Sequence, residues 1–295
     1  EEVISNALDV FIKDYSSFNS EDLENPVYEQ FCHQVILGLT SYTKESTLVK
    51  AAKFFDWYNI PNRNCWFNLE RVISSKLHSN FNPQAMINIM NNFANQKEGS
   101  GEFYDLFQYF FWSGRFKDCS LSDLISMGYN LFLTDQGYDL QYFDLSKEIM
   151  KKMEFDSVEI FDLVRVIQMY SSFQDLYADL FYKIEEIILK KMSIISTSEA
   201  AMLACGFSIA SQGTPELFIN LEEIVLQEFN TLDKYGFRDV VRGYVISGMG
   251  CDKTFLLVMS EFINMSYIGG LNTTNSKGSS NTSDIDNNSN GSPVR

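Results

Sequence analysis

Residues 217–226 read Leu-Phe-Ile-Asn-Leu-Glu-Glu-Ile-Val-Leu, and versions of this stretch recur along the chain at a nearly constant spacing. Thirty-seven residues earlier, residues 180–189 read Leu-Phe-Tyr-Lys-Ile-Glu-Glu-Ile-Ile-Leu. Farther upstream, the Asn-Leu-Glu of residues 68–70 precedes the Asn-Leu-Glu of residues 220–222 by 152 positions, which is four steps of 38. A stretch that returns with a period of this length is typical of proteins built from stacked helical pairs.

A second series of matching residues has the same period. Residues 206–213 and residues 243–250 each begin with Gly followed by an aromatic residue and end with Gly, and the two segments lie 37 positions apart. Two series with one period are difficult to obtain by chance, so we predict an internal repeat of about 37 to 40 residues.

Residue types that cap helix N-termini recur with this period. Ser, Thr, Asp and Asn accept hydrogen bonds from the N–H groups that the first turn of a helix leaves unpaired. Pro83 suits the first position of a helix, and residues 196–199 have the Ser-x-x-Glu form of a capping box. The candidate helix starts are Asn82-Pro83, residues 120–123, residues 156–159, residues 196–199 and Asp233, separated by 38, 36, 40 and 37 residues.

The chain is predicted to be all-α, an α-solenoid of about seven antiparallel helical pairs with this repeat. Its 295 residues include only five Pro, and its apolar residues recur at helical spacing. The expected domains are a helical-repeat solenoid over residues 1–266 and a tail over residues 267–295. The tail is rich in Asn, Ser and Gly, so it buries too little apolar surface to offset its ordering entropy. The expected pairs are residues 3–42, 44–80, 82–117, 120–153, 156–195, 196–232 and 233–265.

The overall charge restricts the classes of partner. The formal net charge is −16 and the isoelectric point is near 4.5, which disfavours a general nucleic-acid or anionic-membrane surface. No apolar run reaches the roughly 18 residues of a membrane span, so the chain is not expected to cross a membrane. The five cysteines contain no Cys-x-x-Cys pair, and we interpret them as small apolar residues packed inside helices without disulfides.

Residues suited to catalysis or cofactor binding are scarce. Only two His occur, His33 and His78, and Cys32 precedes His33 directly, so the two side chains point about 100° apart on a helix. The pairs Glu185-Glu186 and Glu222-Glu223 recur with the repeat, which indicates a solvated face. Residues 248–250, Gly-Met-Gly, lack the rest of a nucleotide-binding motif and are interpreted as a turn. We therefore predict no enzyme, and no catalytic, cofactor-binding or metal-binding residue.

One stretch of the repeat supports a resemblance to a known family. Residues 204–213 read Ala-Cys-Gly-Phe-Ser-Ile-Ala-Ser-Gln-Gly and precede residues 217–226. This pair resembles the helical repeats of the heptatricopeptide and octotricopeptide group, including the repeat region of FAST-kinase-like organellar proteins. The match covers about residues 156–265. The resemblance implies an α-solenoid in mitochondria or plastids, acting mostly on RNA, but this chain lacks a RAP-type domain after the repeats and is acidic.

Two functions are expected from these observations. The first is a non-enzymatic protein–protein scaffold, an accessory subunit of a large mitochondrial assembly, with a respiratory-chain complex favoured over the ribosome. The alternative is an RNA-binding helical-repeat factor in organellar RNA processing or translation. Because the sequence begins at Glu1 without Met, it is interpreted as a processed or trimmed product, with removal of an organellar presequence left open, and the cytoplasm is the alternative location. The candidate phosphate contacts of the alternative are Lys50, Lys53, Arg165 and Arg242.

Overall fold

The computed structural model describes residues 1–14, 26–77, 81–116, 118–137, 139–154 and 157–275. Within these ranges the chain forms fourteen α-helices, three short 3-10 segments and one π-helical segment, and no β-strand. The prediction of an all-α chain is confirmed. Of the predicted tail, residues 276–295 lie outside the described residues.

The helices begin and end close to the predicted limits. The last helix, α14, continues to Asn275 and so includes residues 267–275, which were assigned to the tail. In chain order the elements are α1 (Glu2–Asp14), α2 (Pro26–Gly38), α3 (Glu45–Trp57), α4 (Arg63–Leu77), α5 (Pro83–Asn95), α6 (Gly101–Trp112), α7 (Leu121–Leu133), α8 (Asp139–Lys152), α9 (Ile160–Tyr170), η3 (Ser171–Tyr177), α10 (Ala178–Lys191), η4 (Met192–Ile194), α11 (Thr197–Ile209), α12 (Pro215–Gln227), η5 (Phe229–Thr231), α13 (Lys234–Val240), the π-helical η6 (Val241–Ile246) and α14 (Asp252–Asn275).

Four of the five predicted helix starts are confirmed by their hydrogen bonds. The Asn82 side chain accepts from the backbone N–H groups of the first turn of α5, and Asp233 does the same for α13. Ser120 and Ser196 each form a complete capping box with the acidic residue three positions later, at the starts of α7 and α11. The cap chemistry read from the sequence therefore places these helices correctly.

The predicted start at Asp156 is wrong. Asp156 lies outside the described residues, and α9 begins at Ile160 with Glu159 as its N-cap in extended conformation. Val158 instead packs in the core ahead of α9, and its carbonyl oxygen accepts a hydrogen bond from Lys191 Nζ at 2.7 Å. With this correction the N-caps of α3, α5, α7, α9, α11 and α13 lie 37 to 39 residues apart, more evenly than predicted.

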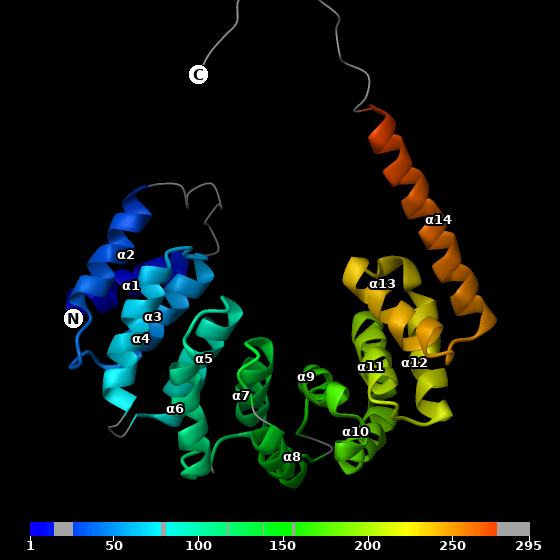
Figure 1. The fold of residues 1–295 in the computed structure, drawn as a ribbon, viewed down its shortest axis with the longest axis horizontal. Helices are drawn as coiled ribbons and strands as arrows, with labels where there is room; N and C mark the ends of the chain where they lie inside the picture. Colours follow the sequence, from blue (N-terminus) through cyan, green and yellow to red (C-terminus); the bar gives the residue numbers. More distant parts are fainter. Residues whose placement is uncertain (15–25, 78–80, 117, 138, 155–156, 276–295) are drawn as a thin grey trace, which may run out of the picture.

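The helices follow one another in file along an arc (Figure 1). Each odd-numbered helix from α1 to α11 packs against the next odd-numbered helix, and α2 packs against α4, α4 against α6, α8 against α10 and α10 against α12. Between α5 and α12, the odd-numbered helices lie on the inner side of the arc and the even-numbered ones on its outer side (Figure 1). We call each odd-numbered helix and the helix after it a repeat, with a first and a second helix.

Aromatic residues join second helices to the first helix of the next repeat. In each second helix from α4 to α14, the fourth residue after the N-cap position is aromatic. In four repeats this ring packs against a ring of the next first helix, or of η6, the π-helical continuation of α13. These contacts are T-shaped, as aromatic pairs prefer. The pairs are Trp66 with Phe93, Tyr142 with Tyr170, Phe181 with Phe207 and Phe218 with Tyr244, at centroid distances of 4.8, 5.9, 5.4 and 6.3 Å.

The glycines of the second sequence series allow the first helices to approach closely. A Cβ added at Gly243 would lie 2.9 Å from the Cys205 backbone N, and one added at Gly206 would lie 2.1 Å from Ile167 Cγ2. The predicted turn at residues 248–250 is also confirmed, since Gly248 has a φ of 72° in the connection between η6 and α14. The close approaches explain why Gly recurs at positions 206 and 243.

The substitution Gly243→Ala is expected to lower the free energy of unfolding by about 1 to 3 kcal/mol, because the added methyl meets the backbone of α11. Urea denaturation followed by circular dichroism measures the loss. Gly101→Ala is the matched control, since a Cβ there meets only the Gln136 side chain at 3.4 Å. Equal stability of the two variants would contradict the close approach of η6 and α11.

Candidate protein-binding surfaces

The recurring Glu pairs are not simply a solvated face, and the prediction is wrong for the first Glu of each pair. Glu185 and Glu222 are buried, whereas their neighbours Glu186 and Glu223 are exposed. Glu222 accepts hydrogen bonds from the Cys251 N–H at 2.7 Å and from the hydroxyl of Thr254, both at the start of α14. The buried carboxylate thus caps the second helix of the next repeat.

The same contact occurs in other repeats. Glu185 accepts hydrogen bonds from the N–H of Thr214 at 3.1 Å and from its hydroxyl, at the start of α12. Glu70 does the same for Ser100, the N-cap of α6. Negative charge at a helix N-terminus is favourable because it faces unpaired N–H groups and the positive end of the helix dipole. The match of residues 68–70 with 220–222 was the sequence signal for this contact.

Replacing Glu222 by Ala should destabilise the last repeat by about 1 to 3 kcal/mol, because two donors at the start of α14 lose their acceptor. Relative to the wild type, the variant should show faster amide hydrogen exchange in α14 and unchanged exchange in α5. The matched control is Glu223→Ala, the exposed neighbour, for which a change within about 0.5 kcal/mol is expected. If both variants lose the same stability, Glu222 has no capping role.

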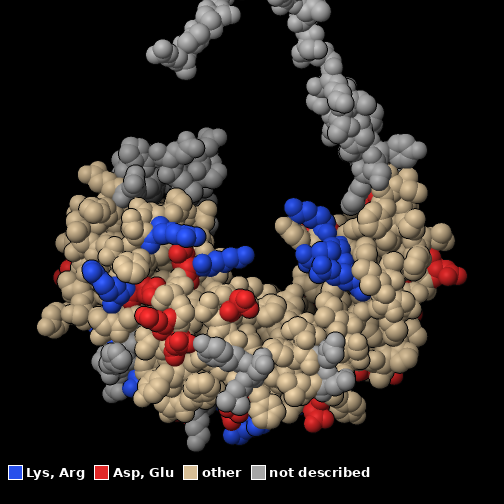
Figure 2. Space-filling view, in the orientation of Figure 1, with Lys and Arg blue, Asp and Glu red and all other residues tan. Residues whose placement is uncertain are grey.

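Three of the four candidate phosphate contacts lie on the first helices α3 and α9, and Arg242 lies on η6, the continuation of α13. Lys50 and Arg165 occupy the same position of the repeat, six residues after the N-cap, and Lys53 and Arg242 share the position nine residues after it. In Figure 2, Lys and Arg form two separate groups beside the hollow of the arc, one over the N-terminal helices and one over α13. Asp, Glu and uncharged residues lie between them, so this view shows no continuous basic surface.

Three of these four cations are engaged in contacts within the chain. Lys50 forms an ion pair with Asp9 at 2.6 Å, and Lys53 lies over the Trp57 ring at 3.9 Å. Arg165 is half-buried, donates to Ser126 at 3.2 Å and stacks on Phe161. Such contacts reduce the availability of these side chains for phosphate.

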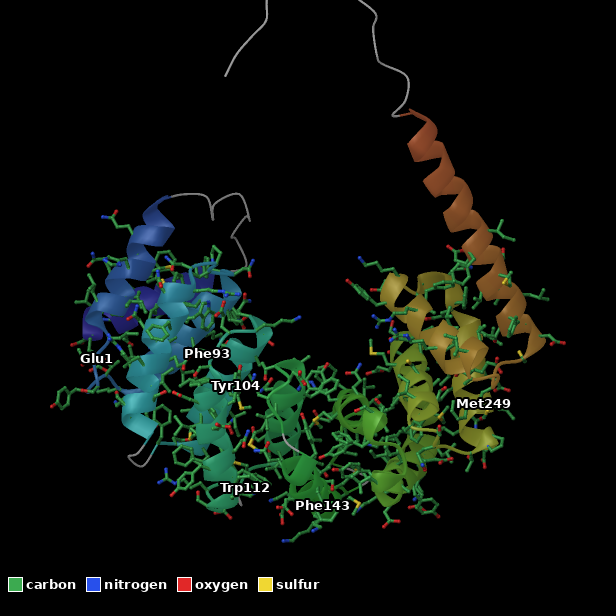
Figure 3. All side chains as sticks on the ribbon, in the orientation of Figure 1. Glu1, Phe93, Tyr104, Trp112, Phe143 and Met249 are labelled. Atoms are coloured by element: carbon green, nitrogen blue, oxygen red, sulfur yellow. The ribbon has the colours of Figure 1, made fainter. Side chains whose placement is uncertain are left out.

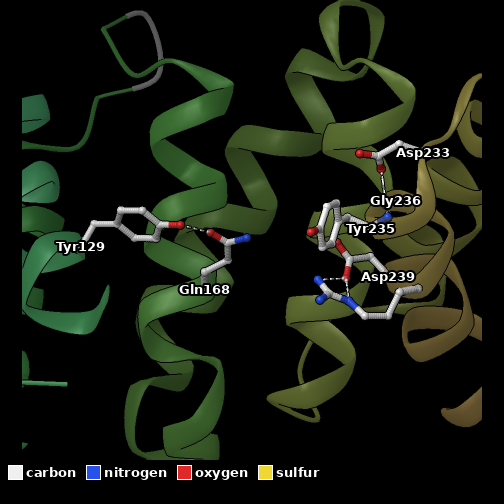
Figure 4. Close-up of polar contacts among 7 residues, drawn as sticks. Tyr129, Gln168, Asp233, Tyr235, Gly236 and Asp239 are labelled. Carbon is white, nitrogen blue, oxygen red and sulfur yellow. Dashed lines mark hydrogen bonds and ion pairs between the residues drawn. The ribbon is translucent and has the colours of Figure 1, made fainter. Parts of the chain in front are cut away.

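The first helices also carry polar contacts within the chain, one between neighbouring repeats and one within α13. The Tyr129 hydroxyl donates to Gln168 Oε1 at 3.0 Å, joining α7 to α9 (Figure 4). On α13, Arg238 forms an ion pair with the adjacent Asp239 at 3.0 Å (Figure 4). Polar side chains of α7 and α9, and the Arg238 side chain of α13, are therefore engaged within the chain.

Cys32 and His33 do not form a catalytic dyad. His33 is exposed on α2, whereas Cys32 beside it is buried, and His78 lies outside the described residues. Among the described side chains, no group of three His, Cys, Asp or Glu could hold a metal ion. A hollow of about 650 Å³ beside Arg242 is lined by three Ser, Gln212, Gly213 and apolar residues, and Arg242 is its single ionisable side chain. That lining offers no acid–base pair.

The interpretation of the cysteines as packed apolar residues holds for three of the five. Cys32, Cys65 and Cys205 are buried, Cys119 is half-buried, and Cys251 is exposed at the N-cap position of α14. Cys251 is the exception. Its backbone N–H donates to Glu222, and its side chain is exposed at the start of α14. Burial raises the pKa of the Cys205 thiol to about 11.

Because the thiolate is the reactive form, Cys251 should react with N-ethylmaleimide at pH 7.5 roughly a hundredfold faster than Cys205. Peptide mapping by mass spectrometry after timed quenching gives both rates in one sample. In denaturant the two rates should converge. Similar rates in the native protein would contradict the burial of Cys205.

Exposed apolar side chains recur on the outer face of the arc. Five residues after the N-cap position of the second helix, an exposed apolar residue stands on α4, α8, α10, α12 and α14, while α6 has Asp105 there. We call this set the apolar row; Figure 3 shows its member Phe143 at the outer edge of the arc, near Trp112. The members of the apolar row are Phe67, Phe143, Tyr182, Ile219 and Leu256, exposed by 40 to 71%.

A second apolar surface lies on α14, and we call it the end face. It consists of Phe255, Met259 and Ile263, which stand on one side of the helix at a spacing of four residues. Phe255 is 44% exposed, although the aromatic residues at the same repeat position on α4, α6, α8, α10 and α12 are all buried. Met259 occupies the position of the capping residues Glu185 and Glu222 and is 52% exposed.

Comparisons with known proteins leave the chain unassigned. A scan against models of known protein families finds no match, and a search of curated proteins finds no match either. Across the described residues, no helix combines the length and the apolar character needed to cross a bilayer. The end face and the apolar row therefore have to be interpreted from their own chemistry.

Proposed function

We propose that the chain is an α-solenoid of seven antiparallel helical pairs that acts as a protein–protein scaffold and not as an enzyme. The even N-cap spacing, the packing of helices in file and the repeated capping by a buried Glu support the solenoid. The resemblance to heptatricopeptide and octotricopeptide repeats stays a prediction.

The single observation that carries the scaffold role is the end face. In a stack of repeats, each repeat covers the apolar side of the one before it. The aromatic residue that is covered in five successive second helices is uncovered at Phe255, next to Met259 and Ile263. Contiguous apolar side chains at the surface mark sites where proteins associate. The partner is another protein subunit that packs on α14 as a further repeat would.

The charge distribution favours a protein partner over RNA. The net charge is −16, and in Figure 2 the cations stand in two separate groups. A phosphate backbone requires closely spaced Lys and Arg along one track. The role of accessory subunit in a large mitochondrial assembly, a respiratory-chain complex before the ribosome, and the mitochondrial location stay predictions from the sequence, with the cytoplasm as the alternative location.

RNA binding is the second candidate because of one observation on the inner face. Lys50 and Arg165 stand at one repeat position, and Lys53 and Arg242 at another, which is how a solenoid would present cations to successive phosphates. The contacts of Lys50 with Asp9 and of Arg165 with Phe161 argue against it.

The scaffold role is tested by native gel electrophoresis and identification of co-purifying proteins. The wild-type chain should migrate in a complex well above its own 33.9 kDa. The double variant Phe255→Ser, Met259→Asn should release it, because the partner loses its apolar contact. Tyr109→Ser, at an exposed aromatic residue of α6 outside both surfaces, should leave the complex intact.

A native chain that migrates alone, or a complex that survives the double variant, would contradict a scaffold role through α14. The RNA candidate is decided separately by filter binding of single-stranded RNA at low and high salt. We expect no retention. Retention that falls steeply with salt and is lost in the double variant Lys53→Ala, Arg242→Ala would establish RNA binding instead.

A further inference from the structure

The outer face of α10 and α12 has a charge pattern that the rest of the apolar row lacks. Tyr182 and Ile219, the apolar-row residues of these two helices, are 65% and 57% exposed. On each helix an acidic residue stands three positions before the apolar residue and another four positions after it, on the same side of the helix. The four acidic residues, all exposed, are Asp179 and Glu186 on α10 and Glu216 and Glu223 on α12.

These residues form three parallel rows across two packed helices. Helices α10 and α12 are direct neighbours, so residues at the same repeat position lie side by side. An apolar row therefore runs between two acidic rows. Leu256 extends the apolar row onto α14, where Lys253 and Ser260 replace the acidic residues.

The four carboxylates have no cationic partner among the described residues. None of them takes part in any of the ion pairs that the described side chains form. The nearby cation Lys183 donates to the Met150 carbonyl oxygen at 2.6 Å, toward the preceding repeat. The acidic rows are therefore available to a partner.

Earlier repeats show that the pattern is not a general property of the outer face. On α4, Phe67 stands between Asn64 and Arg71, and on α6 the apolar residue is replaced by Asp105. On α8, the Lys147 ammonium lies over the Phe143 ring at 3.8 Å. Among the described second helices, an uncovered apolar residue with acidic residues on both sides is thus confined to α10 and α12.

We propose that the outer face of α10 and α12 binds an amphipathic protein segment with an apolar stripe flanked by Lys or Arg on both sides. Packed helices lie about 8 to 10 Å apart, which sets the spacing of Tyr182 and Ile219. A helical segment with an apolar residue every seven positions, about 10.5 Å, runs across both helices in register. Its flanking cations reach the two acidic rows, and the pairs gain strength because the apolar contact excludes water.

This surface rests on the proposed scaffold role but is separate from the end face. The probe is a fluorescein-labelled 21-residue helical peptide with Leu at every seventh position and Lys on both sides of the Leu stripe. Fluorescence anisotropy with the purified full chain measures its binding. Two comparison peptides share its length: one has Glu in place of Lys, and one has the same composition in scrambled order.

Binding of the Lys peptide should weaken at least tenfold in the variant Ile219→Ser and in the double variant Glu186→Gln, Glu223→Gln. The charge variant should also reduce the dependence on salt. Phe67→Ser is the matched control, because Phe67 is 63% exposed at the same repeat position with Asn64 and Arg71 in place of the two acidic residues, and it should bind like the wild type. The end-face variant Phe255→Ser, Met259→Asn should also bind the peptide normally.

Several outcomes would overturn the proposal: no binding of the Lys peptide, equal binding of the scrambled or Glu peptide, or equal weakening by Phe67→Ser. Since Glu186 and Glu223 are exposed, the charge variant is expected to fold normally, and circular dichroism checks this. Failure of the peptide to bind, with the native complex still dependent on Phe255, would remove this surface and leave the scaffold role. If instead no native complex is found while the Lys peptide still binds, the scaffold role is removed and this surface remains.

Discussion

The contact between the second helix of one repeat and the first helix of the next is the constraint on which the structure depends. At this contact the ring of Phe181 or Phe218 packs against a ring of the next repeat. Each contact joins two helices through residues that lie 26 positions apart in the sequence. A buried Glu adds a second link by capping the next second helix. The helices of one repeat pack against each other as well as against the neighbouring repeats, so each repeat covers part of the apolar surface of the next.

The period, most helix starts and the recurrence of Gly206 and Gly243 could be predicted because each leaves a local signal in the sequence. At Ser120 and Ser196, a Ser with an acidic residue three positions later caps a helix through contacts within a single turn. The start at Asp156 was predicted wrongly because the burial of Val158 and its bond to Lys191 depend on a distant part of the chain. The burial of Glu222 was missed for the same reason, since its partners lie 29 and 32 residues away.

The binding surfaces were beyond prediction for a different physical reason. Phe218 and Phe255 are the same residue type at the same repeat position, yet one is buried and the other exposed. The difference depends on whether a further repeat covers the ring and not on the residue type. Conversely, the sequence alone does not distinguish Lys50 and Arg165 from free surface cations. In the folded chain Lys50 pairs with Asp9, and Arg165 stacks on Phe161.

Met259 stands at the repeat position where Glu185 and Glu222 cap the next second helix, and this affects where further repeats could be added. Duplication of an interior unit, such as α11 with α12, would bring its own carboxylate cap and fit between existing neighbours. Duplication of the unit that ends in α14 would place a thioether where the incoming helix needs an acceptor for its first N–H groups. A unit inserted in the middle of the array would therefore keep its carboxylate cap, while one added directly after α14 would lack it.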